Sequence, residues 1–383
     1  MQNVSSSNSE KALVPKLRFP EFTDEWETSL FEELFTFLGN NTLSRAELSD
    51  KGTIRNIHYG DILTKFDNVI NTNNDILPFV KNNDKIKNYT FLQSGDIIIA
   101  DTAEDDTVGK SIELYSNEND KVISGLHTIP CRTQKSFYPK YLGYYLNSPH
   151  FHNQLIPLMQ GIKVLSVSKQ HILKTKIFYP CKNEQSKISE ILSLIDKKIQ
   201  LQQQLIENLK LYKRGLVKRI FNSFSNSEFV PLKSICVINK GKQLSKVNMK
   251  SDGKYYVLNG GITPSGFTDN YNTEGNTISI SEGGNSCGFV NYNTSRFWSG
   301  GHCYTLDIIN GNFNKEFLYQ YLKYNESEIM KLRVGSGLSN IQKSAIEEYL
   351  VLKIDISFQE KIADLFGTID NKIYKSEKLF DGI

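Results

Sequence analysis

The sequence contains few cysteines, and their placement argues against two kinds of structural site. Five cysteines are scattered over 383 residues, and none belongs to a CxxC pair. An odd and scattered set forms no disulfide framework and is typical of a reducing cytoplasm, and without CxxC pairs there is no zinc knuckle. We therefore predict a cytoplasmic protein that binds no metal. The cysteines are Cys131, Cys181, Cys236, Cys287 and Cys303.

Long apolar runs are also missing. No stretch of 18 apolar residues occurs, and the N-terminal sequence MQNVSSSNSEKA has no apolar core of the kind a signal peptide needs. We expect no membrane association and a flexible leader over residues 1–15. The formal charge of +3, from 45 basic and 42 acidic residues, is too small to indicate a nucleic-acid partner by itself.

Motifs of common catalytic sites are absent as well. The sequence has no GxGxxG, GxSxG or HExxH motif, and no proline-proline motif of an adenine methyltransferase. The segment Gly109-Lys110-Ser111 resembles the end of a phosphate-binding loop, but Glu104 stands where that loop requires glycine and two more acidic residues follow it. Carboxylates there would repel a phosphate. We predict no catalysis, and an enzyme acting alone, such as a nuclease, is the least favoured reading.

A long helix is predicted over residues 183–222. Its apolar residues recur in steps of three and four along one seam, which only Gln202 and Lys213 interrupt. Thirty-nine residues (183–221) at about 1.5 Å each make a rod of roughly 58 Å, which needs a second helix to cover its seam. The seam residues are Ile188, Leu192, Ile195, Ile199, Ile206 and Leu209.

The second helix is predicted over residues 357–383, where the same seam recurs 174 positions later with Ser376 at the place of Gln202. The segment Ser357-Phe-Gln-Glu360 predicts a capping box at its start. This copy stops about a dozen residues before the first one does, either because it is naturally short or because the chain is a truncated product. Its seam residues are Ile362, Phe366, Ile369, Ile373 and Phe380.

The segments that precede the two helices also repeat. GTIRNIHYG (52–60) corresponds to GKYYVLNGG (253–261) at an offset of 201, residues 94–101 to 274–281 at 180, and His127 to His302 at 175. Each segment combines β-like runs with short helical patterns. We predict an α+β protein in which an internal duplication gives two mixed α/β domains, 16–182 and 223–356, each followed by a long helix.

Two glycine-rich segments of the second domain, 259–266 and 281–288, have two readings of about equal weight. They are tight β-turns, or they form a surface in which small polar side chains meet DNA bases and backbone N–H groups meet phosphates. The second reading, with the corresponding segments of the first domain, predicts twelve DNA-binding residues. They are Arg45, His58, Lys110, His127, Lys242, Asn259, Ser265, Glu282, Asn285, Ser286, Arg296 and His302.

The residues at the start of each helix resemble a known family. Pro180, Glu184-Gln185 and Ile195-Asp196 in the first copy, with Phe358-Gln359-Glu360 and Ile369-Asp370 in the second, are similar to the repeated region of the DNA-specificity subunit of type I restriction-modification systems. The opening sequence PKLRFPEF also resembles that family. Because the motifs recur at one spacing, together they are more specific than any one of them.

This resemblance implies a function for each part. Each globular domain would be a target-recognition domain that reads one half of a split double-stranded DNA sequence, and the two helices would form an antiparallel coiled coil that sets the spacing. Two methyltransferase subunits carrying S-adenosylmethionine would bind the helices, and restriction and translocase subunits would use ATP and Mg²⁺. The chain itself would need no cofactor. The rival reading is a non-enzymatic coiled-coil scaffold or adaptor with two protein-binding domains.

Overall fold

The computed structural model describes residues 15–335 and 339–382. The chain divides into two compact units, residues 1–197 and 198–383, with the division inside the long helix. Both units combine β-sheets with helices, which confirms the predicted fold class. The predicted leader, apart from Pro15, lies outside the described residues.

The first unit contains most of the strands. Its elements are β1 (Glu27–Leu30), α1 (Phe31–Leu34), β2 (Phe35–Phe37), η1 (Arg45–Glu47), β3 (Leu48–Ser49), β4 (Arg55–Ile57), α2 (Tyr59–Thr64), β5 (Val69–Asn71), β6 (Phe79–Val80), η2 (Asn83–Lys85), β7 (Ile97–Ala100), β8 (Thr102–Ala103), β9 (Ser111–Tyr115), β10 (Val122–Ser124), β11 (Thr128–Thr133), α3 (Tyr141–Leu146), α4 (Pro149–Leu155), η3 (Ile156–Leu158), β12 (Leu165–Ser166), α5 (Lys169–Leu173), β13 (Lys176–Tyr179) and the first part of α6 (Lys182–Ser223).

The central sheet of the first unit has the strand order β2-β11-β7-β9-β5. Strand β7 reads Ile-Ile-Ile-Ala and is buried throughout. Ile97 and Ile99 pack into one hydrophobic cluster with Phe31, while Ile98 packs into another with Ile57. A strand buried on both faces has no polar residues to alternate with, so its sequence is a continuous apolar run.

The second unit repeats this plan with fewer strands. Its elements are the rest of α6, β14 (Glu228–Pro231), η4 (Leu232–Ser234), β15 (Cys236–Lys240), η5 (Lys246–Asn248), β16 (Tyr255–Leu258), β17 (Gly266–Thr268), β18 (Thr277–Ser281), β19 (Val290–Asn293), β20 (Trp298–Ser299), β21 (Cys303–Ile308), α7 (Lys315–Tyr324), α8 (Glu326–Lys331), α9 (Lys343–Glu347), β22 (Leu350–Lys353) and α10 (Ile356–Asp381). The sheet order β15-β21-β18-β19 corresponds to β2-β11-β7-β9, with β18 buried throughout like β7.

A buried glutamine attaches each long helix to its own domain. Gln185 donates to the carbonyl of Pro180 at 2.8 Å and accepts from the N–H of Tyr138 at 2.8 Å. Gln359 makes the same two contacts at equivalent positions, donating to Ile354 at 2.8 Å and accepting from Asn314 at 2.9 Å. Both side chains are almost fully buried. The repeated glutamine is therefore a joint between the helix, the preceding strand and the loop before α3 or α7.

An aspartate eleven residues after the glutamine makes a second attachment between each long helix and its domain. Asp196 accepts from the hydroxyl of Tyr144 in α3 at 2.7 Å. Asp370 accepts from the side-chain amide of Gln320 in α7 at 2.9 Å. Tyr144 and Gln320 occupy corresponding positions of the two domains, since α3 and α7 are corresponding helices. The motif residues that mark the repeat thus hold each helix on its domain.

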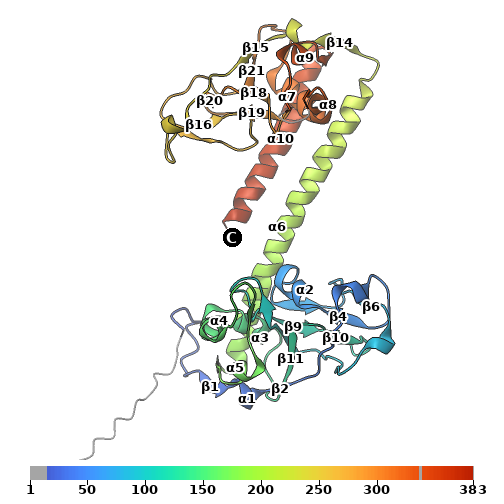
Figure 1. Cartoon of the computed structure of the whole chain (residues 1–383), viewed down its shortest axis with the longest axis vertical. Coiled ribbons are helices and arrows are strands. Elements are labelled where there is room, and N and C mark those ends of the chain that lie inside the picture. The colour runs from blue at the N-terminus through green and yellow to red at the C-terminus, as the bar shows by residue number, and fades with distance from the viewer. Residues whose placement is uncertain (1–14, 336–338, 383) are drawn as a thin grey trace, which may run out of the picture. The chain divides into compact units, whose positions relative to one another are not determined.

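Within the second unit, α10 lies antiparallel beside the second part of α6 (Figure 1). Phe221 and Phe366 are in ring contact, with centroids 6.3 Å apart. Lys213, which interrupts the predicted seam, pairs with Asp370 at 2.6 Å. Still nearer the end of α10, Gln202 donates to the backbone carbonyl of Ser376 at 2.8 Å. The partners run in opposite directions along the two helices, as expected for an antiparallel pair.

Several seam residues are covered wholly or partly by a domain. Ile188 packs against the core of the first unit, and Leu192 is only half-buried. Ile362, Phe366 and Ile369 belong to the core of the second unit. The seam predicts that these residues share one face of a helix, but the globular domains cover parts of that face. Of the other seam residues, Ile206 is buried, Ile199, Leu209, Ile373 and Phe380 are half-buried, and Ile195 is exposed.

The predicted capping box of the second helix is wrong. The helix begins one residue earlier than predicted, at Ile356, and Asp355 is its N-cap, with a side chain that accepts from the N–H of Ser357 at 2.8 Å. Aspartate at this position satisfies one of the free N–H groups of the first turn. Among the helices of the described residues, none is long and apolar enough to cross a membrane.

Candidate nucleic-acid interface

The register of the central sheet brings Asp101 and His127 together in the first unit. Strands β7 and β11 are antiparallel, and Ala100 lies opposite Thr128. The next residues outward are Asp101 and His127, and the N–H of Asp101 donates to the His127 carbonyl at 3.2 Å. Nδ1 of His127 lies 3.3 Å from Oδ1 of Asp101. His127 has a positive φ of 54°, which few residues other than glycine adopt.

The second unit repeats this pair with a longer carboxylate. Ser281 of β18 lies opposite Cys303 of β21, so Glu282 and His302 follow at the same edge. The N–H of Glu282 donates to the His302 carbonyl at 2.9 Å, and Nδ1 of His302 lies 3.3 Å from Oε2 of Glu282. Two domains with different loops thus present one carboxylate–histidine pair each, at the same place in the sheet.

A short segment accompanies the pair in each unit, and we call these segments the tip loops: residues 160–166 in the first unit, and the described residues 334–335 and 339–340 in the second. Each tip loop is closed by two backbone hydrogen bonds between its ends, Gln160 with Ser166 at 2.9 and 2.8 Å, and Val334 with Asn340 at 2.8 and 3.0 Å. In the first tip loop Ile162 is fully exposed. This side chain therefore contributes nothing to the hydrophobic core of the first unit.

The tip loops are attached directly to the carboxylate residues. The N–H of Val167, just after the first loop, donates to the Asp101 carbonyl at 2.9 Å. The N–H of Ile341 donates to the Glu282 carbonyl at 2.8 Å. Histidine, carboxylate and tip loop therefore form one structural unit in each domain, built on backbone bonds that do not depend on the variable side chains.

Other polar residues surround the pair in the first unit. Arg45 makes a two-pronged ion pair with Asp61, at 2.5 and 2.7 Å. His58 caps α2, and burial lowers the pKa of its imidazole. The Tyr59 ring lies 4.7 Å from that of His58 and 5.3 Å from that of His127. Three of the four residues predicted in this domain, Arg45, His58 and His127, therefore gather at one site.

The second unit surrounds its pair with a different set. Oε1 of Glu282 accepts from Lys240 at 2.6 Å and from the hydroxyl of Tyr304 at 3.1 Å. Burial favours a higher pKa for the Glu282 carboxyl, but these two partners outweigh it and hold the pKa below its usual value. The side chain of Asn259 accepts from the N–H of His302 at 3.4 Å. Asn259, Glu282 and His302, all predicted, thus lie together.

Two predicted residues are engaged elsewhere in their domains. Nζ of Lys110 donates to the carbonyls of Leu63 and Phe66 at 3.3 and 2.7 Å, at the end of α2, and burial lowers its pKa. Arg296 pairs with Glu274 at 2.8 Å. Both cations hold local structure, because each is bound to groups outside the histidine site.

The four remaining predicted residues lie on loops of the second unit. Asn285 and Ser286 are on the turn that follows Glu282, and Asn285 is exposed. Ser265 is exposed and donates its N–H to the carbonyl of Val257. Lys242 is exposed, and its backbone makes two hydrogen bonds to β20: its N–H donates to the Ser299 carbonyl and its carbonyl accepts from Nε1 of Trp298. Among the residues that the structure describes, no three His, Cys, Asp or Glu side chains are grouped closely enough to hold a metal ion.

Comparison with known proteins identifies the family that has this arrangement. A family model, the type I restriction modification DNA specificity domain, matches residues 23–211 and again residues 225–379. These two matches together cover most of the chain. The chain belongs to this family.

Individual relatives agree with the family match. The chain is 34% identical over 162 residues to a Mycoplasma pneumoniae protein named as a type I specificity subunit, an alignment that covers 42% of this chain and 43% of the relative. A Mycoplasma genitalium protein of the same description is 32% identical over 155 residues, or 39% of each chain. The matches thus span about two fifths of the length of these relatives.

A solved structure shares the fold over nearly the whole chain. The crystal structure of a type I restriction-modification system S subunit from M. genitalium matches with a TM-score of 0.66 and 18% identity, covering 97% of this chain and 96% of that one. At this identity the likeness concerns the fold. It shows that the order of domain, long helix, domain and long helix is the architecture of a specificity-domain protein.

Asp101, Lys240 and Tyr304 complete the two sites but do not stand out in the sequence. Aligning residues 94–101 with 274–281 places Asp101 with Ser281. In the structure the residue equivalent to Ser281 is Ala100, because the N–H of Gly109 donates to the Ala100 carbonyl at 2.9 Å, just as the N–H of Gly288 donates to the Ser281 carbonyl at 2.8 Å. The offset is therefore 181 and not 180. A slip of one residue turns side chains to the opposite face of a strand, which hides the equivalence of Asp101 and Glu282.

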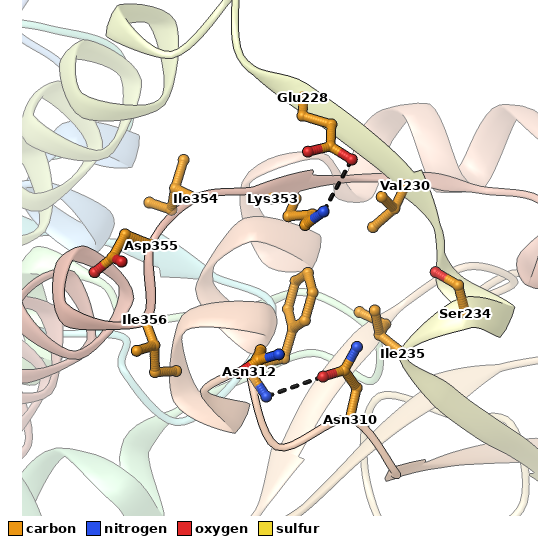
Figure 2. Close-up of a pocket in the computed structure, with 11 residues that line it drawn as sticks. Glu228, Val230, Ser234, Ile235, Asn310, Asn312, Lys353, Ile354, Asp355 and Ile356 are labelled. Atoms are coloured by element: carbon orange, nitrogen blue, oxygen red, sulfur yellow. Dashed lines mark hydrogen bonds and ion pairs between the residues drawn. The ribbon is translucent and has the colours of Figure 1, made fainter.

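A pocket of about 660 Å³ in the second unit lies apart from these residues, between β14, β22 and the start of α10 (Figure 2). The Lys353–Glu228 ion pair of 2.9 Å lies at its edge, and its wall includes Ile354. In the first unit, the position that corresponds to Lys353 is Tyr179, which is buried. Nζ of Lys135 lies over the Tyr179 ring, 4.3 Å from its centroid, in a cation–π contact. None of the predicted DNA-binding residues lines this pocket.

Proposed function

We propose that this chain is the sequence-specific DNA-binding subunit of a type I restriction-modification complex. Each domain reads one half of a split double-stranded DNA sequence, and the chain positions methyltransferase and restriction subunits on it. The family match and the two domains that share a frame but differ in loops support this proposal.

One observation carries the proposal: the same backbone frame holds different polar side chains in the two domains. Around Asp101 and His127 stand Arg45, His58 and Tyr59, whereas Glu282 and His302 have Lys240 and Asn259. Base edges in the major groove present different patterns of donors and acceptors, so different side chains on one frame read different sequences. A protein-binding scaffold gives no reason for this arrangement.

The long helices supply the spacing between the two readers. The 42 residues of α6 correspond to about 63 Å of helix. Half-sites on one face of B-DNA lie about 34 to 36 Å apart for each helical turn between them. A helix of this length is long enough to bridge a spacing of that order, and we assign to it the role of fixing the number of unread base pairs.

Exposed apolar residues at equivalent positions of the two helices fit two copies of one partner. Ile191 of α6 and Leu365 of α10 are 44% and 40% exposed, and Leu205 and Leu379 are 46% and 53% exposed. Each pair is 174 residues apart, the offset of the repeat. We assign these positions to two methyltransferase subunits, which carry S-adenosylmethionine and flip the target adenine. Restriction and translocase subunits supply ATP and Mg²⁺ chemistry, and this chain is non-catalytic.

The test is to assemble the chain with its methyltransferase subunits, treat random-sequence DNA with S-adenosylmethionine, and sequence the methylated adenines. We expect two short motifs at a fixed spacing. If the assembled complex shows no sequence preference, the proposal is wrong and the scaffold reading takes its place. Methylation of a single continuous motif would contradict the assignment of one half-site to each domain.

A further inference from the structure

The two histidines differ from the polar residues around them in one respect. Nδ1 of His127 and of His302 is held 3.3 Å from a carboxylate in both domains, while the other residues of the two sites differ. The side chains remain 47% and 61% exposed. Among the described residues, neither Nε2 atom has a hydrogen-bond partner. The polar contacts of both rings thus fall on one side and leave the other free.

The carboxylate determines what the free nitrogen can do. A carboxylate accepts hydrogen bonds, so in the neutral form of the ring the proton lies on the adjacent Nδ1 and Nε2 keeps a lone pair. In the first unit the hydroxyl of Thr102 contacts both groups: it donates to Asp101 at 2.8 Å, and its oxygen lies 3.4 Å from Nδ1 of His127 and can accept from it. In that form each ring presents a hydrogen-bond acceptor, Nε2, to solvent.

The sheet fixes where this acceptor lies. The backbone N–H of each carboxylate residue donates to the carbonyl of its histidine, at 3.2 Å for Asp101 and 2.9 Å for Glu282, and a tip loop is bonded to the other side of each carboxylate residue. Such a group is pre-organised, so little entropy is lost when it contacts a ligand. Preorganisation of this kind is required of a residue that distinguishes ligands by one hydrogen bond.

We propose that His127 and His302 are specificity-determining residues, each of which accepts a hydrogen bond at Nε2 from the exocyclic amino group of one adenine or cytosine in its own half-site. Those amino groups are the donors that bases present in the major groove. Asp101 and Glu282 are positioning residues that hold the proton on Nδ1. This inference rests on the proposed function and adds to it the contact that each domain makes.

The test is a cycle that removes the histidine and the amino group separately and together. The probe is the duplex selected from random DNA by the assembled complex, with adenine replaced by purine, or cytosine by 2-pyrimidinone, at one position at a time. For the unmodified chain, loss of the amino group at one position of the second half-site should weaken binding by about 5- to 150-fold. For His302→Ala the same replacement should have no effect, while every other position behaves as before.

His127→Ala is the matched control, because it should remove the sensitivity at one position of the first half-site only. The half-site that each variant still reads shows that the chain is folded and assembled. Glu282→Gln should reduce the discrimination at the His302 position without moving it, since the ring loses the group that holds its proton. Equal weakening of all duplexes, or the same sensitivity with and without the histidine, would overturn the inference while leaving the selected motif, and with it the proposed function, in place.

Discussion

Gln202 and Ser376 occupy equivalent positions of the repeat, 174 residues apart, and they contact each other: Nε2 of Gln202 donates to the backbone carbonyl of Ser376 at 2.8 Å. When two equivalent helices pack antiparallel, a residue contacts the equivalent residue of the other helix only at the local twofold axis. This polar contact therefore marks the register of α6 against α10, a role that polar seam residues have in other coiled coils.

Gln202→Glu should destabilise the helix pair. The substitution keeps the shape of the side chain but replaces the donor with a carboxylate that faces a carbonyl oxygen, and we expect a loss of about 1 to 2 kcal/mol at neutral pH. Gln203→Glu is the control, because it adds the same charge at an exposed neighbouring position. The measurement is urea unfolding followed by helix content. The loss should shrink below about pH 4, where the introduced carboxyl is protonated and can donate again. Equal effects of the two substitutions would show that the contact does not matter.

Gln359→Leu should destabilise the second unit much more than the first. The amide of Gln359 also donates to the carbonyl of Asn312 at 3.0 Å, so its removal takes a side-chain partner from three part-buried backbone groups. We expect a cost of about 2 to 4 kcal/mol, measured as lost hydrogen-exchange protection in β21 and β22. Gln185→Leu should give the mirror result, with protection lost in β11 and β13. Equal loss in both units from either substitution would mean that the joint is not local.

The duplication and the long helices could be predicted from the sequence because they depend on periodicity. What covers a helix face could not, since periodicity shows only which residues share it: Ile188 and Phe366 look alike in the seam, yet each packs into the core of a different domain. The equivalence of His127 and His302 could be predicted because the segments that contain them repeat at one offset. The equivalence of Asp101 and Glu282 could not, because β7 and β18 are buried on both faces and have no alternation to fix their alignment.

Glu113 should make the stability of the first unit depend on pH. Burial raises the pKa of this carboxyl from 4.5 to about 7, although the N–H groups of Gly143 and Lys140 donate to it. Because the folded pKa is above the unfolded one, the contribution is fully present below about pH 4.5 and is lost as the pH rises through 7. The full change is up to about 3 kcal/mol.

The measurement for Glu113 is urea unfolding between pH 4 and 8, with hydrogen exchange in β9 as the local readout. Glu113→Gln should flatten the decline in stability over this range, since the side chain no longer ionises. Glu118→Gln, at an exposed position in the loop after β9, should leave the decline unchanged. A decline of the same size in the Glu113→Gln variant would show that another group causes it.

Leu205 and Leu379 give the sharpest test of the partner assignment. They are equivalent residues on α6 and α10, both about half exposed, and burial of one leucine side chain at an interface contributes about 1.5 to 3 kcal/mol. Leu205→Lys and Leu379→Lys should therefore each weaken the binding of one methyltransferase subunit and leave the binding of the other unchanged. Native mass spectrometry should then find one subunit per chain, where the unmodified chain binds two. The double substitution should leave none. Gln204→Lys, which adds the same charge one residue away on α6, should keep both subunits, because a partner seated on the apolar positions does not cover that side chain. If either single substitution removed both subunits together, the partners would bind as one unit, and the equivalence of Leu205 and Leu379 would reflect the history of the repeat and not two separate docking sites.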